Sequence, residues 1–404
     1  MALRAITIGG RIAAGLLLIA LAIQPCSVSY PRKLRSKLAH STSKLFAFER
    51  NGRVGFIDPT GRVVIPPEIQ AAIEDVGDFS NGLARVGTQG FIDETGKWAF
   101  KGNYRWLEDF SGGFARASID DPDREYWQLD LILDRNGSIV ARVPRLRLRS
   151  FSEGLVAFES EGKPAIRNWQ PGHFDYRDFP GLQGFLDSTG NVAIPATFAD
   201  VGPFVDGLAR AALDGYCHLV TWDNGKEGSP TSGYPTSCGG APDDAVTICK
   251  VGFIYRNGAF AIPPEFESGQ DFQEGLAAVR IGGRWGFIDR DGKFAVAPRF
   301  QQTQSFSEGL AAVKIGRKWG FIDRSGALVI EPGFDSVEPF SESFSLVNSD
   351  KRQFFIDRSG RVAIQGPFRE ATPFVQGLAS ILLDEKHVAY INKSGKTVFE
   401  YSRH

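Results

Sequence analysis

The stretch RKWGFIDRSG, from Arg317 to Gly326, occurs three times in this chain with little change. GRWGFIDRDG begins 34 residues earlier, at Gly283, and RQFFIDRSG follows from Arg352. The F-I-D core, or a close variant, recurs at spacings of 35, 41, 53, 68, 34, 34, 34 and 35 residues. The nine cores begin at Phe56, Phe91, Ile132, Phe185, Phe253, Phe287, Phe321, Phe355 and Tyr390. Such self-similarity predicts a repeat architecture, which overrides the two or three domains that the length of 404 residues suggests.

A second signature precedes the core in each repeat. It reads FSEGLAAV at Phe306, and a worn copy, KLFAFE, precedes the first core at Lys44. The other copies begin at Phe79, Phe110, Phe151, Phe204, Phe272, Phe340 and Phe374. Each repeat therefore contains three short strand-forming runs, such as GLAAVK, KWGFID and ALVI, separated by tight polar turns. This pattern predicts antiparallel hairpins, and the Gly, Pro and β-branched residues of every repeat argue against helical repeats of similar length.

The residues before the core resemble those of a known family. A Trp-Gly pair stands at Trp285-Gly286 and at Trp319-Gly320, and in other repeats the Gly persists without the Trp. The chain resembles the WG-repeat family of bacterial proteins from about Lys44 to Tyr401. The resemblance implies a β-rich repeat scaffold that binds other molecules, and it supplies no catalytic residues.

The expected fold is all-β: nine three-stranded antiparallel repeats of about 34 residues in a propeller-like array. Propellers typically have about 4–8 blades, so an open β-solenoid or superhelical array is the alternative. One three-stranded sheet cannot form a core alone, so each repeat must bury its aromatic face against a neighbour. The core is therefore expected to contain the Phe of F-I-D and the Leu of the second signature, namely Leu83, Leu155, Leu208, Leu276, Leu310 and Leu378.

The N-terminus has the pattern of an export signal. Arg4 and Arg11 precede an apolar run at residues 12–23, and the small residues Ser27 and Ser29 follow it. Residues 1–29 are therefore expected to be a secretory signal peptide or, alternatively, an uncleaved membrane anchor. A basic linker at residues 30–43 leads into the repeat domain, residues 44–404. The protein is expected to be exported, and so periplasmic, secreted or at the cell surface.

Composition and motifs give no sign of catalysis. The net charge is −1 and no basic stripe is present, which argues against nucleic-acid binding. The sequence contains no HExxH motif, P-loop or Ser-His-Asp order, and no cofactor or metal is expected. The Asp that ends F-I-D stands three residues before a Gly, so it is expected to cap a turn rather than to bind Ca²⁺. The acid of the second signature, as at Glu153, Glu274 and Glu308, is interpreted as a solvated loop acid, and the Trp of the pair as a packing residue.

Three repeats are longer than the others, and the extra residues always lie between the second signature and the core. The insertions lie near residues 118–130, 159–183 and 213–250. Insertions on one hairpin project from one face of a regular array, which is the usual place for binding. The candidate binding residues are the aromatic side chains Tyr126, Trp127, Trp169, Tyr176, Tyr216, Trp222 and Tyr234. Burial of these aromatics against the scaffold is the alternative.

The third insertion contains three cysteines: Cys217, Cys238 and Cys249. In an exported chain a disulfide is expected, either Cys217–Cys249 or Cys238–Cys249, with one thiol left over. The sequence as a whole predicts an exported, non-catalytic repeat scaffold. It is expected to bind a protein or carbohydrate partner through the insertion-bearing hairpins. The alternatives are an envelope hydrolase with its site in the insertions and a purely structural spacer.

Overall fold

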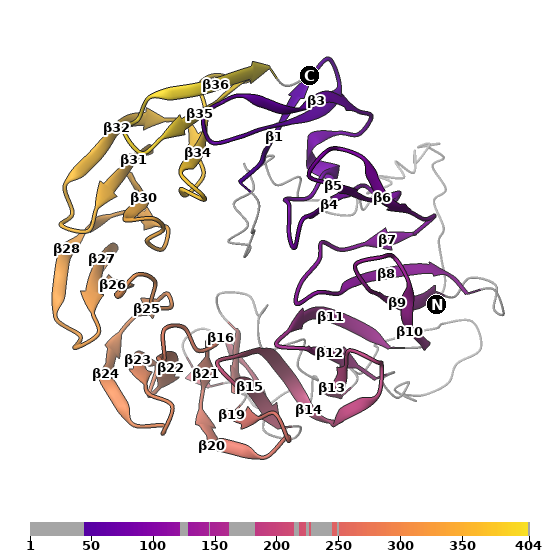
Figure 1. Cartoon of the computed structure of the whole chain (residues 1–404). Helices are drawn as coiled ribbons and strands as arrows, with labels where there is room; N and C mark the ends of the chain where they lie inside the picture. The colour runs from indigo at the N-terminus through magenta and orange to yellow at the C-terminus, as the bar shows by residue number, and fades with distance from the viewer. Residues whose placement is uncertain are drawn as a thin grey trace, which may run out of the picture. The chain divides into compact units, whose positions relative to one another are not determined.

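A computed structural model describes residues 44–121, 128–144, 146–160, 182–213, 218–223, 226–227, 245–248 and 250–402. The chain divides into two compact units, residues 1–33 and 34–404. Every described residue belongs to the second unit, whose sheets follow one another in chain order (Figure 1). The expected signal peptide and basic linker lie outside the described residues.

The described residues are almost entirely β-strand. Repeat 1 contains β1 (Phe46–Arg50), β2 (Arg53–Ile57) and β3 (Val63–Ile69), followed by the 3-10 helix η1 (Ile73–Asp75). Repeat 2 contains β4 (Leu83–Val86), β5 (Gly90–Asp93) and β6 (Trp98–Lys101). Repeat 3 contains β7 (Trp106–Leu107), β8 (Ala115–Asp120), β9 (Gln128–Leu133) and β10 (Ile139–Pro144). Repeat 4 contains β11 (Arg147–Ser152), β12 (Leu155–Glu159), β13 (Gln183–Asp187) and β14 (Val192–Val205).

Strand β14 continues into the next repeat, so repeats 4 and 5 share one sheet. Repeat 5 adds β15 (Leu208–Leu213), β19 (Val251–Tyr255) and β20 (Phe260–Phe266). Its insertion carries a separate small sheet of β16 (His218–Asp223), β17 (Lys226–Glu227) and β18 (Ala245–Ile248). Repeat 6 contains β21 (Ser268–Gly269), β22 (Ala277–Ile281), β23 (Arg284–Ile288) and β24 (Phe294–Phe300).

The last three repeats are the most regular. Repeat 7 contains β25 (Gln302–Thr303), β26 (Leu310–Ile315), β27 (Lys318–Asp323) and β28 (Leu328–Phe334). Repeat 8 contains β29 (Ser336–Val337), β30 (Phe344–Ser349), β31 (Arg352–Asp357) and β32 (Val362–Phe368). Repeat 9 contains β33 (Glu370–Ala371), β34 (Leu378–Leu382), β35 (His387–Asn392) and β36 (Thr397–Ser402). All neighbouring strands pair antiparallel, as in β26–β27–β28.

Most repeats have one strand more than the sequence predicts. In these repeats the three expected strands are the second, third and fourth strands. The residues before the second signature add a short first strand, as Ser336–Val337 does by pairing with β30. Two residues cannot show an alternating pattern, so this strand cannot be recognised in the sequence. Among the described residues, repeat 1 has no first strand and repeat 2 has only the bridge between Val76 and Val86.

Neighbouring repeats pack through the residues that recur. In seven junctions, the Phe of F-I-D lies 4.6–4.9 Å, centroid to centroid, from the first Phe of the next repeat's second signature. The predicted core Phe and Leu residues are all buried. The turn glycine after F-I-D packs on the fourth strand of the preceding repeat, since a Cβ on Gly326 would lie 2.9 Å from Val296.

The first and last repeats make the same kinds of contact with each other. Strand β36 lies against β1, as β28 lies against β30 (Figure 1). A Cβ on Gly61, the turn glycine of repeat 1, would meet the carbonyl of Val398 in β36. The turn glycine therefore packs on the fourth strand of the neighbouring repeat here as well. The hydroxyl of Tyr390 donates a 2.6 Å hydrogen bond to the carbonyl of Ala47, and Phe48 packs with Tyr401 in a shared cluster. The nine repeats are therefore a propeller-like array whose ends meet.

Candidate functional site

The aspartate of F-I-D caps a turn, as the sequence predicts. In repeat 7 the Asp323 carboxylate accepts backbone N–H bonds from Ser325 at 2.9 Å and Ala327 at 3.0 Å. The Ser325 hydroxyl, which also donates to this carboxylate, is the main cause that lowers the pKa of Asp323. Asn392 accepts the equivalent backbone bonds in repeat 9. Since a neutral amide does the same work, these carboxylates act as turn caps.

The acid of the second signature is exposed in its loop at Glu153 and Glu274, as the sequence predicts, and it also makes a bond that the sequence does not reveal. Its residue lies at positive φ, and its carboxylate accepts a backbone N–H from the next repeat, as between Glu274 and Gly309 at 2.9 Å. The Arg that follows F-I-D in that next repeat, Arg324, donates to the carbonyl of Glu274 at 2.7 Å. The sequence of one repeat cannot reveal this bond, because its partner lies about one repeat away. These acids therefore join neighbouring repeats.

The glycine of the Trp-Gly pair is required by crowding. A Cβ on Gly286 would lie 2.6 Å from the carbonyl oxygen of Val296 and 2.7 Å from the nitrogen of Pro298, both in β24. The ladder between β23 and β24 shifts register beside this glycine. Trp285 is half-buried and packs against the core cluster of repeats 6 and 7, consistent with the packing role expected for it. The pair is thus a structural feature of the sheet.

The three insertions leave from equivalent hairpins, as the sequence predicts. They join β8 to β9, β12 to β13 and β15 to β19, which are the second and third strands of repeats 3, 4 and 5. Trp222 lies in β16, where it pairs with Glu227 of β17. The other candidate binding residues lie outside the described residues: Tyr126, Trp127, Trp169, Tyr176, Tyr216 and Tyr234. Cys217, Cys238 and Cys249 also lie outside them, so the disulfide stays a prediction.

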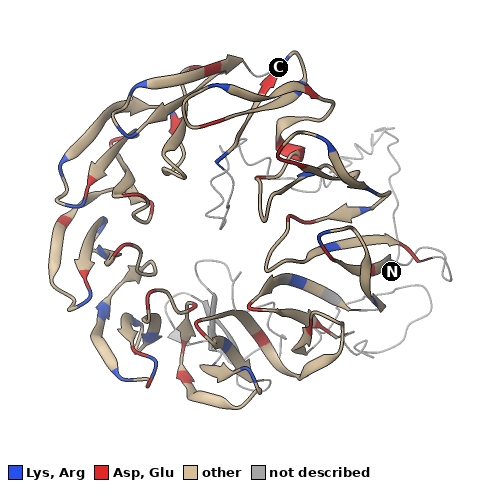
Figure 2. Cartoon of the chain, viewed as in Figure 1, with Lys and Arg blue, Asp and Glu red and all other residues tan. Residues whose placement is uncertain are grey.

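Charged side chains near the first and second strands join repeats 2 and 3 and also pair within repeat 3. Arg85 of repeat 2 pairs with Asp109 of repeat 3 at 3.0 Å, and both side chains are largely buried. In repeat 3, the guanidinium of Arg116 lies 4.2 Å from the Trp106 ring centroid and 3.2 Å from Glu108. Burial lowers the pKa of Arg116, although Glu108 opposes this. Lys and Arg are interspersed with Asp and Glu along the other repeats (Figure 2).

Another charged cluster spans repeats 4, 5 and 6. Asp200, whose side chain is 6% exposed, lies 2.6 Å from Arg210 and 3.3 Å from Arg149. Arg210 also approaches Asp271 of repeat 6 at 3.8 Å. Burial raises the pKa of Asp271, against the opposing effect of Arg210. Both arginines pair with Asp200, and the guanidinium of Arg149, 43% exposed against 17% for Arg210, is the more open to solvent.

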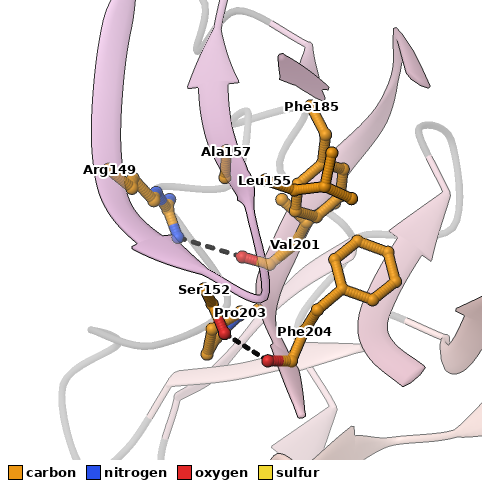
Figure 3. Close-up of a pocket in the computed structure, with 9 residues that line it drawn as sticks. Arg149, Ser152, Leu155, Ala157, Phe185, Val201, Pro203 and Phe204 are labelled. Carbon is orange, nitrogen blue, oxygen red and sulfur yellow. Dashed lines mark hydrogen bonds between the residues drawn. The ribbon is translucent and has the colours of Figure 1, made fainter. Parts of the chain in front are cut away.

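A cavity of about 260 Å³ lies beside Arg149, between repeats 4 and 5 (Figure 3). Its walls are mainly apolar and include Leu155, Ala157, Phe185 and Phe204. Arg149 is the charged residue of the lining. The sequence analysis did not identify this site. The available signal was positional: Ala157, a small residue, stands where repeat 8 carries Leu346.

The described residues contain no group of three or more His, Cys, Asp or Glu side chains placed to hold a metal ion. Within the same ranges, no helix is both long enough and apolar enough to cross a membrane. The groups found in this part of the chain include paired charges, turn caps and a small apolar cavity.

Comparison with known proteins identifies the class. Seven segments match the family model described as WG containing repeat: residues 55–87, 90–121, 184–217, 252–285, 285–319, 319–352 and 354–386. These segments cover more than half of the chain, so the protein belongs to the WG-repeat family, which confirms the resemblance seen in the sequence.

Solved structures agree with the fold. The chain is similar to a structure titled "Crystal structure of the eukaryotic initiation factor", with 12% identity, a TM-score of 0.51, and coverage of 90% of this chain and 96% of that one. BamB from Moraxella catarrhalis matches more loosely, with 10% identity, a TM-score of 0.36, and coverage of 86% and 88%. At such identities the likeness concerns the fold alone. The chain has no match among curated proteins.

Proposed function

We propose that this protein is an exported, non-catalytic scaffold that binds a macromolecular partner through the insertion-bearing hairpins of repeats 3, 4 and 5. One observation supports this most directly. The three insertions leave from the same hairpin position in three consecutive repeats, and the hairpins of repeats 6–8 are closed by short turns such as Gly316–Arg317. A scaffold that only needed to fold would have no use for three long segments at one edge.

The fold supports a binding role in a second way. Each repeat is held to the next by recurring aromatic, glycine and Glu–Arg contacts. Such contacts make the array stiff, and a stiff array keeps neighbouring hairpins in fixed relative positions. Loops on a rigid framework bind with less loss of conformational entropy than loops on a flexible one. The proposed partner is a protein or a glycan, and export rests on the pattern of residues 1–29.

The test compares residues 30–404 with a trimmed variant. In the trimmed variant, residues 121–127, 160–181 and 214–249 are each replaced by the Gly-Arg turn of repeat 7. A control variant keeps the insertions and receives a Gly-Ser segment of similar length at Gly316–Arg317. All three proteins are used to capture partners from envelope extracts, after circular dichroism shows that each is folded.

A partner retained by the full protein and the control variant, and lost by the trimmed variant, is the expected result. Equal capture by all three would contradict the proposal. Release of product from glycan or peptide substrates by the full protein would also contradict it, since the scaffold is proposed to have no catalysis of its own.

A further inference from the structure

The junction between repeats 3 and 4 differs from the next one, between repeats 4 and 5, at three joining positions. Ile132 stands at the phenylalanine of F-I-D, so the ring pair that Phe185 and Phe204 form at 4.8 Å has no counterpart. Gly112 stands at the acid of the second signature, and Ser188 stands at the arginine that follows F-I-D. The sequence thus removes three inter-repeat contacts at one junction.

Two of these contacts are directional bonds that are present between repeats 4 and 5. The carboxylate of Glu153 accepts the backbone N–H of Gly207 at 3.1 Å, and Arg256 donates to the carbonyl of Glu153 at 2.7 Å. Gly112 has no carboxylate and Ser188 has no guanidinium, so neither bond can form between repeats 3 and 4.

The face of repeat 3 that meets repeat 4 also contains polar atoms without partners. Asp130 stands where repeat 7 has Trp319, and its carboxylate accepts the backbone N–H of Leu148 in repeat 4 at 3.5 Å. Ser118 lies opposite Asp130, and Arg116 lies two residues before it, so all three share this face. Nε of Arg116 and Oγ of Ser118 are buried and have no hydrogen-bond partner. Because such atoms gain hydrogen bonds to water when the repeats separate, this junction costs less free energy to open than an apolar one.

Apolar packing and one hydrogen bond hold the junction closed. Phe114 and Phe151 lie 5.2 Å apart, centroid to centroid, beside a cluster that includes Ile132. The hydroxyl of Ser111 donates a 2.7 Å hydrogen bond to the carbonyl of Phe151. The stability of a repeat array is approximately the sum of its repeats and of the interfaces between neighbours. An interface that has lost directional bonds therefore opens before the interface beside it.

We propose that the array opens locally at the junction between repeats 3 and 4, which acts as a hinge between the first insertion and the other two. The first insertion leaves from β8 and β9 of repeat 3, and the second leaves from β12 and β13 of repeat 4. Repeats 4 and 5 share one sheet, so the second and third insertions move together (Figure 1). Opening changes the distance between the first insertion and this pair. The hinge does not depend on the proposed binding function.

The test measures how often a buried thiol becomes accessible. Val156→Cys places a thiol on the face of repeat 4 that packs against Ile132 of repeat 3. Ser345→Cys places one at the equivalent position of repeat 8, and both positions are buried. Residues 30–404 of each variant are treated with iodoacetamide, and mass spectrometry follows the peptide that contains the new cysteine. The thiol at position 156 is expected to react at least about tenfold faster, which is the scale of one lost hydrogen bond to a charged group.

A repaired junction provides the sharper comparison. Gly112→Glu with Ser188→Arg introduces the residue types that join repeats 4 and 5, and is expected to slow modification of Val156→Cys about tenfold. The backbone permits the first change, since φ is 60° at Gly112 and 52° at Glu274, and an added Cβ would meet no atom closer than 3.9 Å. Gly112→Ala with Ser188→Ala changes the same positions without bonding groups and is expected not to slow modification.

The reverse change is made where the junction is intact. The carboxylate of Glu308 accepts the backbone N–H of Ser343 at 2.8 Å between repeats 7 and 8. Glu308→Gly introduces the residue type found at position 112, and is expected to speed the modification of Ser345→Cys.

Urea unfolding of every variant separates local opening from unfolding of the whole array. Equal modification at positions 156 and 345 would overturn the proposal, since both thiols would then react through the same event. A faster reaction at position 156 that is matched by a proportionate loss of global stability would overturn it equally. Unchanged modification after Gly112→Glu with Ser188→Arg would show that the missing bonds do not control opening, which also contradicts the proposal.

Discussion

Replacing Gly320 with alanine is expected to destabilise repeat 7 far more than replacing Gly316, four residues earlier. A Cβ on Gly320 would lie 2.5 Å from the carbonyl oxygen of Ile330 and 2.8 Å from the nitrogen of Pro332. The first distance is about 0.9 Å short of ordinary contact, and both atoms belong to the backbone of β28. The strand itself must therefore move, which weakens its pairing with β27. Overpacking and a weakened ladder bond together correspond to about 3 kcal/mol.

Gly316 provides the matched control because its backbone conformation, and not crowding by a neighbouring strand, favours glycine there. It lies at φ 65° with nothing within 4 Å of an added Cβ. Alanine there suffers left-handed strain of about 1–2 kcal/mol, partly offset by the lower entropy of its unfolded chain. The expected net loss is about 1 kcal/mol or less.

The comparison calls for a local measurement, since an array of repeats need not unfold in one step. Hydrogen exchange of peptides spanning residues 318–334, followed by mass spectrometry, reports the opening of β27 and β28. Urea unfolding followed by circular dichroism gives the stability of the whole array. If Gly320→Ala exchanges no faster than Gly316→Ala, crowding by β28 is not the reason for the glycine of the Trp-Gly pair.

Two further changes test the closure and the turn caps. Tyr390→Phe keeps the ring contacts and removes the hydrogen bond to Ala47. It should lower the free energy of unfolding, measured by urea titration, by about 1 kcal/mol. An unchanged free energy of unfolding would show that this bond does not help to join repeats 9 and 1. Asp323 has a lowered pKa, so its contribution to stability is present above the unfolded pKa and is lost as pH falls through the folded one. Asp323→Asn, which introduces the residue type found at Asn392, should therefore lose less stability than wild type between pH 5 and pH 3 in thermal unfolding, and an unchanged acid dependence would contradict this.

The sequence predicts the fold well where each repeat decides its own structure. The core Phe and Leu residues, the turn-capping aspartates and the three longer strands are all set by alternation and turn chemistry inside one repeat. Asp323 illustrates this, because its partners Ser325 and Ala327 lie within four residues of it. Such features are local, and local patterns are what a single sequence displays.

The features that the sequence did not reveal depend on pairs of residues from different repeats. The sequence alone indicates only that Glu274 is a solvated acid. Its bond to Gly309 is not recognised there, because the two residues lie 35 positions apart. In the sequence, Tyr390 looks like a conservative replacement of Phe. The role of its hydroxyl is seen only in the structure, where it donates a hydrogen bond to Ala47 at the other end of the array. Alignment of the repeats with one another, rather than of the protein with homologues, is the signal that could find such pairs.

That internal alignment also shows what distinguishes the junction between repeats 4 and 5 from the others. Eight other repeats show which residues the fold tolerates at each position, so a departure can be compared with working alternatives in the same molecule. At Arg149 the alternative is Gln304, which makes the same bond to the next repeat without a charge. At Gly202 the alternative is a side chain, and its space is taken here by the Asp271 carboxylate of repeat 6, which an added Cβ would meet. Asp200 and Asp271 supply the carboxylates beside Arg149 and Arg210, so the charges that distinguish this junction compensate one another within the chain.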